Sequence, residues 1–154
     1  MDNNDILRRM RFIFDFNDSK MIEIFDQRDY QVTRAQVSSW LKKDDDPDFR
    51  KLNDDQLAIF LNGLINDKRG KKEGEQPASE TKLNNNIIFR KLKIALNLKD
   101  IDIIEILELA NMKISKHELS AFFRSPGQEQ YRQCMDQILR NFLQGLQIKY
   151  RGNK

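Results

Sequence analysis

The chain repeats itself after 82 residues. Residues 3–70 align with residues 85–152 without a gap, and 18 of the 68 aligned pairs are identical. Both copies begin with an Asn-Asn pair and end with Arg-Gly, and many of the other aligned pairs are alike in size or charge. An internal repeat of this length predicts one structural unit built twice, because both copies carry the same pattern of apolar residues.

A short polar segment joins the two copies. Residues 71–84 read KKEGEQPASETKLN, and their Gly, Pro, Ser and mixed charges are typical of an exposed linker. The predicted organisation is a first repeat over 1–70, a linker over 71–84 and a second repeat over 85–154. Fully extended, the linker would span roughly 45 Å, enough for repeats that pack side by side or exchange between chains.

Apolar residues recur at helical spacing within each copy. The pattern predicts a first helix near 5–16 and 87–98, and a second helix near 18–28 and 100–110. The whole chain contains only six Gly and three Pro, which favours helices over a turn-rich β architecture. The predicted fold class is therefore all-α: two tandem four-helix repeats with helix-turn-helix-like elements, packed with pseudo-symmetry.

Polar residues mark where the helices begin. Thr33 with Gln36, and Ser115 with Glu118, have the spacing of a capping box, in which the hydroxyl accepts from an early backbone N–H and the third residue on reaches back. We expect these pairs to open the third helix of each copy. The remaining helix starts are interpreted as capped by Asn3-Asn4, Asn85-Asn86, Asp18 and Asp100.

Each copy has one glycine inside its predicted fourth helix and another just beyond the end of that helix. Gly63 and Gly145 occupy equivalent interior positions, where glycine costs about 1 kcal/mol relative to alanine. Their recurrence indicates a close helix–helix crossing. Gly70 and Gly152 are predicted to end the same helix, since basic residues precede both of them.

Three stretches of the chain closely resemble the YehS-like bacterial family. They read LNNNIIFRKLKIALNLKDIDIIEIL, FLNGLINDKRGKKEG and RSPGQEQYRQCMDQILRNFLQGL, and the resemblance extends over essentially the whole chain. It implies a tandem duplication of a small helical domain. It implies little about activity, because the family is one of unknown function with no established catalytic residues.

Composition bounds the class of protein. A third of the residues are charged, no apolar run approaches the roughly 20 residues of a membrane span, and the N-terminal residues lack a signal-peptide pattern. We therefore expect a cytoplasmic protein without a membrane partner. The single cysteine, Cys134, cannot form an internal disulfide or a multi-cysteine zinc site, and is interpreted as a small core residue.

Positive charge is concentrated in the second half. Residues 1–70 carry a net charge of −2, residues 71–84 are neutral, and residues 85–154 carry +5. The second and third helices of each copy have the outline of a helix-turn-helix, whose second helix enters a nucleic-acid groove. The candidate nucleic-acid-binding residues are Lys68, Arg69, Lys71, Lys72, Lys91, Lys93, Lys116, Arg124 and Arg151.

Each of these basic features has a purely structural alternative. The run 68–72 could be a helix end that passes into a solvated linker. Arg8 and Arg90 recur at equivalent positions and are interpreted as pairing with Glu23 and Glu105 of the second helix. The Asp-rich stretch 44–48 lacks the spacing of a calcium loop and would repel phosphate, which favours the second copy as the contact surface.

No sequence motif of an enzyme is present. The chain contains no GxxxxGK[ST], GxGxxG or HExxH, and its one histidine, His117, has no evident triad partner. We therefore expect a non-enzymatic cytoplasmic binding protein, without cofactor or metal, that contacts RNA or DNA through basic helix surfaces. The alternative is a protein–protein adaptor or regulator that uses a helical groove. The sequence leaves the oligomeric state open.

Overall fold

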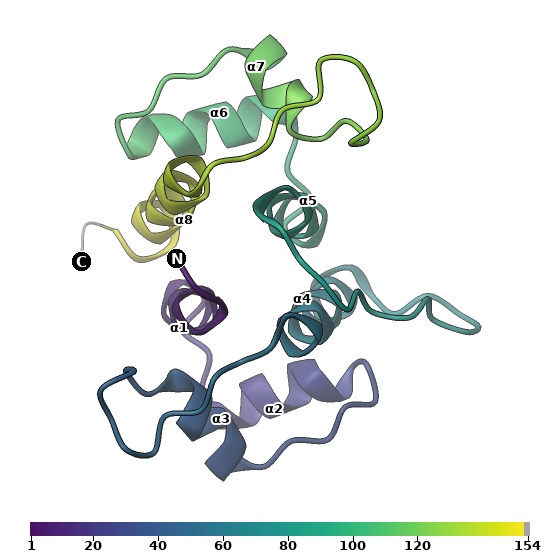
Figure 1. Ribbon diagram of the computed structural model, residues 1–154, viewed down its shortest axis with the longest axis vertical. Coiled ribbons are helices and arrows are strands. Elements are labelled where there is room, and N and C mark those ends of the chain that lie inside the picture. The colour runs from purple at the N-terminus through teal and green to yellow at the C-terminus, as the bar shows by residue number, and fades with distance from the viewer. Residues whose placement is uncertain (153–154) are drawn as a thin grey trace. The chain divides into compact units, whose positions relative to one another are not determined.

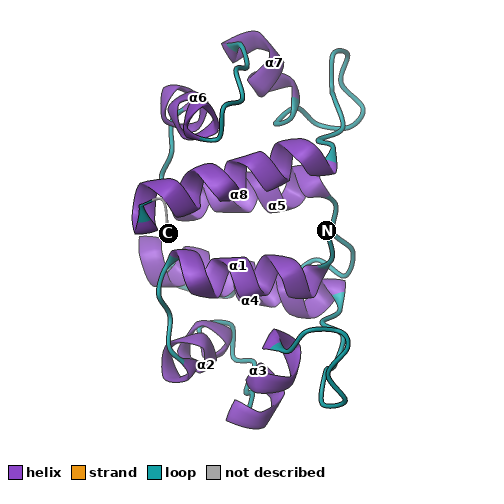
Figure 2. Cartoon of the chain, turned by 90° about the vertical axis from the view of Figure 1, so that its left-hand side faces the viewer, coloured by secondary structure: helices purple, strands orange, loops and turns teal. Residues whose placement is uncertain are grey.

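The chain forms two helical units, as a computed structural model that describes residues 1–152 shows (Figure 1). Contacts divide the chain into Met1–Leu83 and Asn84–Lys154, and each unit contains four helices. Helices and loops account for all of residues 1–152, which contain no strand (Figure 2). The predicted all-α class with two tandem four-helix repeats is confirmed.

The four helices of one unit correspond in order to the four helices of the other. The first unit contains α1 (Asn3–Ile13), α2 (Asp18–Asp26), α3 (Arg34–Leu41) and α4 (Asp54–Arg69). The second contains α5 (Asn85–Ala95), α6 (Asp100–Leu109), α7 (Lys116–Ala121) and α8 (Asp136–Arg151).

The first two helices of each unit end earlier than predicted. Asp15 and Asn97, with φ of 55° and 53°, take the left-handed conformation soon after α1 and α5. Asp29 and Asn111, with φ of 57° and 61°, do the same soon after α2 and α6. Asp and Asn tolerate this region better than other non-glycine residues, so the backbone can turn at these positions and end the helix. The apolar residues continue at helical spacing beyond the turn, which is why the sequence predicts longer helices.

The helix starts are capped close to the predicted positions. Thr33 Oγ1 accepts from Gln36 N at 3.1 Å while Gln36 Oε1 accepts from Thr33 N at 2.8 Å, and Ser115 and Glu118 repeat this exchange. Both predicted capping boxes are thus confirmed. The N-cap of α2 is Asn17 rather than Asp18, and α6 has no side-chain cap from its N-cap residue, so these two assignments were wrong.

The second and fourth helices of each unit touch through their backbones. A Cβ added to Gly63 of α4 would lie 2.0 Å from the carbonyl oxygen of Ile24 in α2. A Cβ added to Gly145 of α8 would lie 2.0 Å from the carbonyl oxygen of Ile106 in α6. The predicted close crossing is confirmed, and glycine is required because no side chain fits between the two helices.

An aromatic cluster fills the core of each unit, with its central ring on a different helix. In the first unit Phe25 of α2 lies 5.4 Å from Trp40 and 5.2 Å from Phe60, between ring centroids. The residue of the second unit equivalent to Phe25 is a leucine, Leu107. There the central ring belongs to α5, which corresponds to α1.

In the second unit Phe89 of α5 lies 6.4 Å from Phe122 and 4.7 Å from Phe142. These two partners are the equivalents of the aromatic residues that surround the central ring of the first unit. The residue of the first unit equivalent to Phe89 is Leu7, which is fully buried. Phenylalanine and leucine have therefore exchanged helices between the units, so that each core keeps one of each at this pair of positions.

The Asn-Asn pairs are not the helix caps that we expected. The N-caps of α1 and α5 are the preceding residues, Asp2 and Asn84, whose side chains accept from Asp5 N and Ile87 N. The Asn pairs instead begin the helix proper and face the rest of their unit. They hold the loop that enters the fourth helix.

Asn4 makes three hydrogen bonds to backbone groups far along the chain. Its Nδ2 donates to the carbonyls of Trp40 and Arg50, both at 2.9 Å, and its Oδ1 accepts from Leu52 N at 3.0 Å. The side chain is 1% exposed. One buried amide thereby joins α1, the end of α3 and the loop before α4, and satisfies three backbone groups.

Asn86 repeats this arrangement in the second unit. Its Nδ2 donates to Phe122 O at 3.1 Å and to Arg132 O at 2.7 Å, and its Oδ1 accepts from Cys134 N at 2.9 Å. The first residue of each pair adds a second tie: Asn85 Nδ2 donates to Asp136 Oδ1 at 2.7 Å. The Asn-Asn pairs are therefore long-range polar clamps, which local capping rules could not reveal.

None of the helices in the described part of the chain is long and apolar enough to cross a membrane.

Candidate functional site

The predicted basic residues of the first unit lie at the end of α4 and the start of the linker. Lys68 and Arg69 occupy the last turn of α4, Gly70 is its C-cap with φ 86°, and Lys71 and Lys72 follow. Lys68 Nζ lies 4.9 Å from the centroid of the Phe14 ring, a cation–π distance. The run is a helix end that passes into the linker, in agreement with the structural alternative.

Three of the predicted basic residues of the second unit are held by their own unit or lie apart from α7. Lys93 Nζ lies 3.2 Å from Asp100 Oδ1 and 4.4 Å from the centroid of the Phe123 ring. It therefore joins α5 to the start of α6 and to the residues after α7. Lys91 also lies on α5, and Arg151 lies in the last turn of α8.

The remaining predicted residues flank α7, where a third basic residue joins them. Lys116 is the first residue of α7 and is exposed, and Arg124 lies two residues beyond the C-cap, Phe122. The backbone N–H of Arg132 donates to Ala121 O at 3.1 Å, which holds the following loop against the end of α7. We refer to Lys116, Arg124 and Arg132 as the α7 cations.

No carboxylate within hydrogen-bond or ion-pair distance neutralises the α7 cations, as far as residues 1–152 show. The Nε atom of Arg124 is buried and lacks a hydrogen-bond partner. Glu118 is the one carboxylate on α7, and the N–H of Ser115 holds its pKa below the ordinary value, with a smaller contribution from nearby Arg132. Its oxygen Oε1 accepts from the N–H of Ser115 in the helix cap, and the three cations outnumber this carboxylate, so the face keeps a net positive charge.

The first unit has the same layout of basic residues around α3, but one of them lies near a carboxylate. Arg34, the equivalent of Lys116, lies 3.8 Å from Asp18 and donates to Ser19 Oγ at 2.9 Å. Lys42 and Arg50, the equivalents of Arg124 and Arg132, line a shallow hollow of about 490 Å³ beside α3. The hollow is also lined by Ala35, Gln36, Ser38, Ser39 and Asp48.

The loops beside these faces differ in charge. Residues 43–48 read KDDDPD in the first unit, whereas residues 125–130 read SPGQEQ in the second. The first loop thus contains four aspartates, of which Asp48 lines the α3 hollow, whereas the second contains one carboxylate, Glu129. The second unit is electrostatically better suited to an anion.

Arg132 was missed in the sequence analysis, although a signal for it existed. It is identical to Arg50 in the aligned repeats, in a loop where most other pairs differ. Charge that persists at one position while its surroundings diverge is a reason to examine that position. We gave weight instead to the densest basic run, at residues 68–72.

Arg8 and Arg90 do not pair with the glutamates of the second helix, as we had expected. Arg8 Nη1 donates to the carbonyl of Lys42 at 2.6 Å, and Arg90 Nη2 lies 3.5 Å from the carbonyl of Phe123. The partner of Glu23 is Lys20, at 3.6 Å. Both arginines therefore reach the carbonyl end of the third helix, where a cation is favourable.

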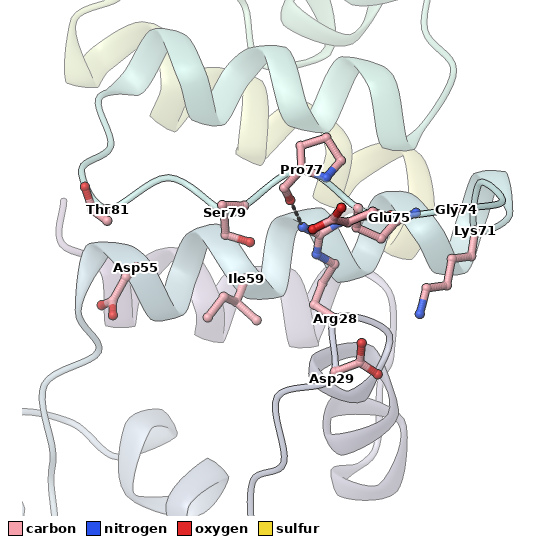
Figure 3. A pocket seen from close by; sticks show the side chains of 12 residues that line it. Arg28, Asp29, Asp55, Ile59, Lys71, Gly74, Glu75, Pro77, Ser79 and Thr81 are labelled. Atoms are coloured by element: carbon pink, nitrogen blue, oxygen red, sulfur yellow. Dashed lines mark hydrogen bonds between the residues drawn. The ribbon is translucent and has the colours of Figure 1, made fainter.

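The linker follows the surface of the first unit rather than extending freely. Arg28 donates from Nη1 to Gln76 Oε1 at 3.0 Å and from Nη2 to the carbonyl of Pro77. Asn62 Nδ2 donates to Ser79 Oγ at 3.1 Å. Figure 3 shows the segment from Pro77 to Thr81 running beside the helix that carries Asp55 and Ile59, with Arg28 pointing at Pro77.

This arrangement belongs to the first unit alone, because the residues that hold the linker are not repeated. Asn66 Nδ2 also lies 3.5 Å from Gln76 Oε1, and the equivalents of Arg28 and Asn66 are Ala110 and Ile148. An open hollow of about 610 Å³ lies between the linker, Arg28 and α4, and its lining mixes acidic, basic and small residues. Such a mixture does not single out one class of ligand.

Cys134 is 1% exposed, which confirms its interpretation as a core residue. Burial raises the pKa of its thiol to about 12. The thiol is therefore protonated at neutral pH and a poor nucleophile. His117 is exposed on α7, and residues 1–152 contain no cluster of three His, Cys, Asp or Glu side chains arranged to hold a metal.

Comparison with known families places this arrangement in a class of duplicated helical proteins. The model of a protein family of unknown function, DUF1456, matches the chain twice, at residues 3–70 and 85–152. The chain belongs to this family, and the two matches coincide with the two copies of the internal repeat.

A relative in Escherichia coli strain K12, described as the uncharacterized protein YehS, is 39% identical over 155 residues. The match covers 100% of this chain and 99% of the relative. The resemblance to the YehS-like family is thus confirmed over the full length. No solved structure matches the chain.

Proposed function

We propose that the protein is a non-enzymatic, cytoplasmic binding protein that contacts the phosphate backbone of RNA or DNA through the α7 cations. The observation that carries the proposal is that Lys116, Arg124 and Arg132 lie at the two ends of one short helix without a carboxylate partner in the described residues. Phosphate oxygens are the acceptors that such unpaired cations bind in nucleic-acid complexes.

The recurrence of these charges supports the proposal. Each α7 cation has a basic equivalent in the first unit, at Arg34, Lys42 and Arg50. The duplicated layout would give the chain two faces that bind the phosphate backbone of a nucleic acid. The face of the second unit would bind more tightly, because it lacks the Asp-rich loop. The third helix of each unit, α3 or α7, carries one of these faces, as in a helix-turn-helix.

Five of the originally predicted residues have a smaller part in this proposal. Lys93 is paired with Asp100, and Lys68 lies over an aromatic ring. Arg69, Lys71 and Lys72 stay as predicted electrostatic contacts at the exposed end of α4. They would add attraction at long range rather than position the ligand.

Binding to short mixed-sequence RNA and duplex DNA, measured as a function of salt, tests the proposal. We expect an affinity that falls steeply between about 50 and 200 mM salt, with a slope that shrinks by about 0.7–0.9 for each phosphate contact removed. Substituting Lys116, Arg124 and Arg132 together by alanine should therefore flatten the slope and weaken binding.

A matched variant separates the α7 cations from net charge. Lys113, Arg140 and Lys149 are exposed and belong to the same unit, so their combined substitution by alanine removes the same charge elsewhere. The proposal predicts that this variant binds nearly as the wild type does. Equal losses in the two variants, or no binding at about 50 mM salt, would contradict it.

A further inference from the structure

The helix α6 carries more aliphatic residues than its unit can bury. Six of its ten residues are Ile or Leu, but only Ile103, Ile106 and Leu107 are buried. Ile101 is 58% exposed and Leu109 is 45% exposed. Single exposed aliphatic residues are ordinary, but several on one helix face mark a contact surface.

These residues share a face with two carboxylates. Relative to Ile101, residues 104, 105 and 108 lie at i+3, i+4 and i+7, so they follow one side of the helix. Glu105 and Glu108 are both exposed at the centre of this side. We define the outer face of α6 as Ile101, Ile104, Glu105, Glu108 and Leu109.

The first unit provides a comparison within the same chain. The equivalents of Glu105 and Glu108 are Glu23 and Asp26, so the acidic character recurs. The equivalents of Ile101 and Leu109 are polar, Ser19 and Gln27. The exposed aliphatic residues are therefore particular to α6 and are not demanded by the fold of the repeat.

We propose that the outer face of α6 is a docking surface for a protein partner that offers an amphipathic helix with aliphatic and basic side chains. Charge complementarity selects this occupant. Glu105 and Glu108 would attract lysine or arginine, while Ile101 and Leu109 would bury aliphatic groups of the partner.

The same carboxylates argue against other occupants. Nucleic acid and anionic membranes would be repelled by two exposed glutamates. A second copy that docked through this face would bring Glu105 and Glu108 against the same residues of its partner, and like charges brought together cost several kcal/mol. The proposal is independent of the α7 cations, so either proposal can fail alone.

Defined peptides test the docking surface on the full chain. The probe is a synthetic helical peptide with leucines and lysines at i, i+3 and i+4 spacing. Two reference peptides replace its lysines by glutamates or its leucines by serines. We expect saturable one-to-one binding of the leucine–lysine peptide, and much weaker binding of both reference peptides, by fluorescence anisotropy.

Substitutions taken from the first unit locate the binding. Ile101→Ser together with Leu109→Gln introduces the residues that the first unit has at these positions, which the repeat tolerates, and should weaken binding of the leucine–lysine peptide about tenfold or more. Glu105→Lys with Glu108→Lys should reverse the preference toward the leucine–glutamate peptide. Ile94→Ser, at a 45% exposed position on α5, is the matched control and should leave the affinity unchanged.

Four results would overturn the proposal. They are equal affinity in wild type and the Ile101→Ser, Leu109→Gln variant; equal loss in the Ile94→Ser control; self-association in sedimentation that this double substitution abolishes; and binding to phosphatidylserine vesicles that it abolishes. Circular dichroism of each variant confirms that the chain is folded.

Discussion

Phe25 of α2 and Phe89 of α5 hold equivalent aromatic clusters together from different helices of their units. Phe25 lies 5.2 Å from Phe60, and Phe89 lies 4.7 Å from Phe142, the equivalent of Phe60. Each unit has a leucine where the other unit has its central phenylalanine. In the first unit this is Leu7 of α1, and in the second it is Leu107 of α6. The two cores are thus alternative packings of nearly the same set of side chains.

This exchange predicts a compensating pair of substitutions in the first unit. Phe25→Leu should destabilise by about 1–2 kcal/mol through a cavity, and Leu7→Phe by about 1–3 kcal/mol through overpacking. The double variant should lose at least about 1 kcal/mol less unfolding free energy than the two single variants lose in sum. The reason is that the new phenylalanine ring occupies the space that the removed ring leaves. Urea unfolding of the four proteins measures this coupling, and strict additivity would show that the two positions are independent.

Asn86 should be the most sensitive polar residue of the second unit. Asn86→Ala removes three hydrogen bonds and leaves the buried carbonyl of Phe122 and the N–H of Cys134 without their partner. We expect a loss of about 2–4 kcal/mol in the free energy of unfolding. Gln133→Ala, at an exposed position in the same loop, should change it by less than about 0.5 kcal/mol.

The thiol of Cys134 provides an independent measurement of this prediction. Because Cys134 is buried and protonated, a thiol reagent should label the native wild type slowly. Asn86→Ala should speed the labelling, since it loosens the loop that contains Cys134. A variant with an unchanged labelling rate and unchanged stability would remove the assigned role of Asn86.

Gly145→Ala should destabilise the protein although alanine is the better helix former. The new Cβ would lie 2.0 Å from the carbonyl oxygen of Ile106, so α6 and α8 must separate. We expect a net loss of at least about 2 kcal/mol, after a gain of about 1 kcal/mol from helix propensity. Gly127→Ala, where the added Cβ meets nothing within 4 Å, is the control. Thermal unfolding of both variants is sufficient, and equal melting temperatures would refute the close crossing.

Asp54 should make the stability of the protein fall in acid. Its Oδ1 accepts from Asn3 Nδ2 at 2.7 Å and its Oδ2 from Leu83 N at 2.9 Å, and these bonds, the one from Asn3 above all, hold its pKa below 3.8. A lowered pKa contributes stability that is present above about pH 4 and is lost as the pH falls through the folded-state pKa. Asp54→Asn should therefore flatten the decline in the urea midpoint below pH 4.

The neighbouring carboxylate separates this effect from a general loss of charge. Asp55 is exposed in the same helical turn and makes neither bond. Asp55→Asn should leave the acid limb of the stability profile as steep as in the wild type. Identical profiles for the two variants would show that the bonds of Asp54 do not couple folding to pH.

Arg28 should control how firmly the linker is held to the first unit. Arg28→Ala removes the hydrogen bonds to Gln76 and Pro77 and should raise the rate of tryptic cleavage at Lys71 and Lys72 several-fold. Arg140→Ala, which removes one arginine at an exposed position of the second unit, is the control. Cleavage at the wild-type rate in the Arg28 variant would mean that other contacts hold the linker.

Local signals in the sequence predicted much of the fold. The capping boxes at Thr33 and Ser115 depend on residues three positions apart, and glycine inside a helix needed a packing reason at Gly63 and Gly145. The roles of Asn4 and Asn86 could not be predicted in this way. Their partners lie 36 to 48 positions further along the chain, and nothing near an asparagine indicates which distant carbonyl it will meet.

The candidate site was predicted less completely, for a similar reason. Composition correctly located positive charge in the second half, and Lys116 and Arg124 were named. Sequence alone could not show that Asp100 pairs with Lys93, or that the backbone of Arg132 is tied to Ala121 at 3.1 Å. Whether a charge is neutralised depends on a partner that only the fold brings near.

The polar clamps of Asn4 and Asn86 have a consequence for the history of the chain. Every donor and acceptor in each clamp comes from its own unit, so neither copy borrows a group from the other to close its loop. Either copy alone therefore encodes every group that its clamp needs. Divergence after the duplication could then act on surfaces, leaving an acidic loop in one descendant and an aliphatic helix face in the other.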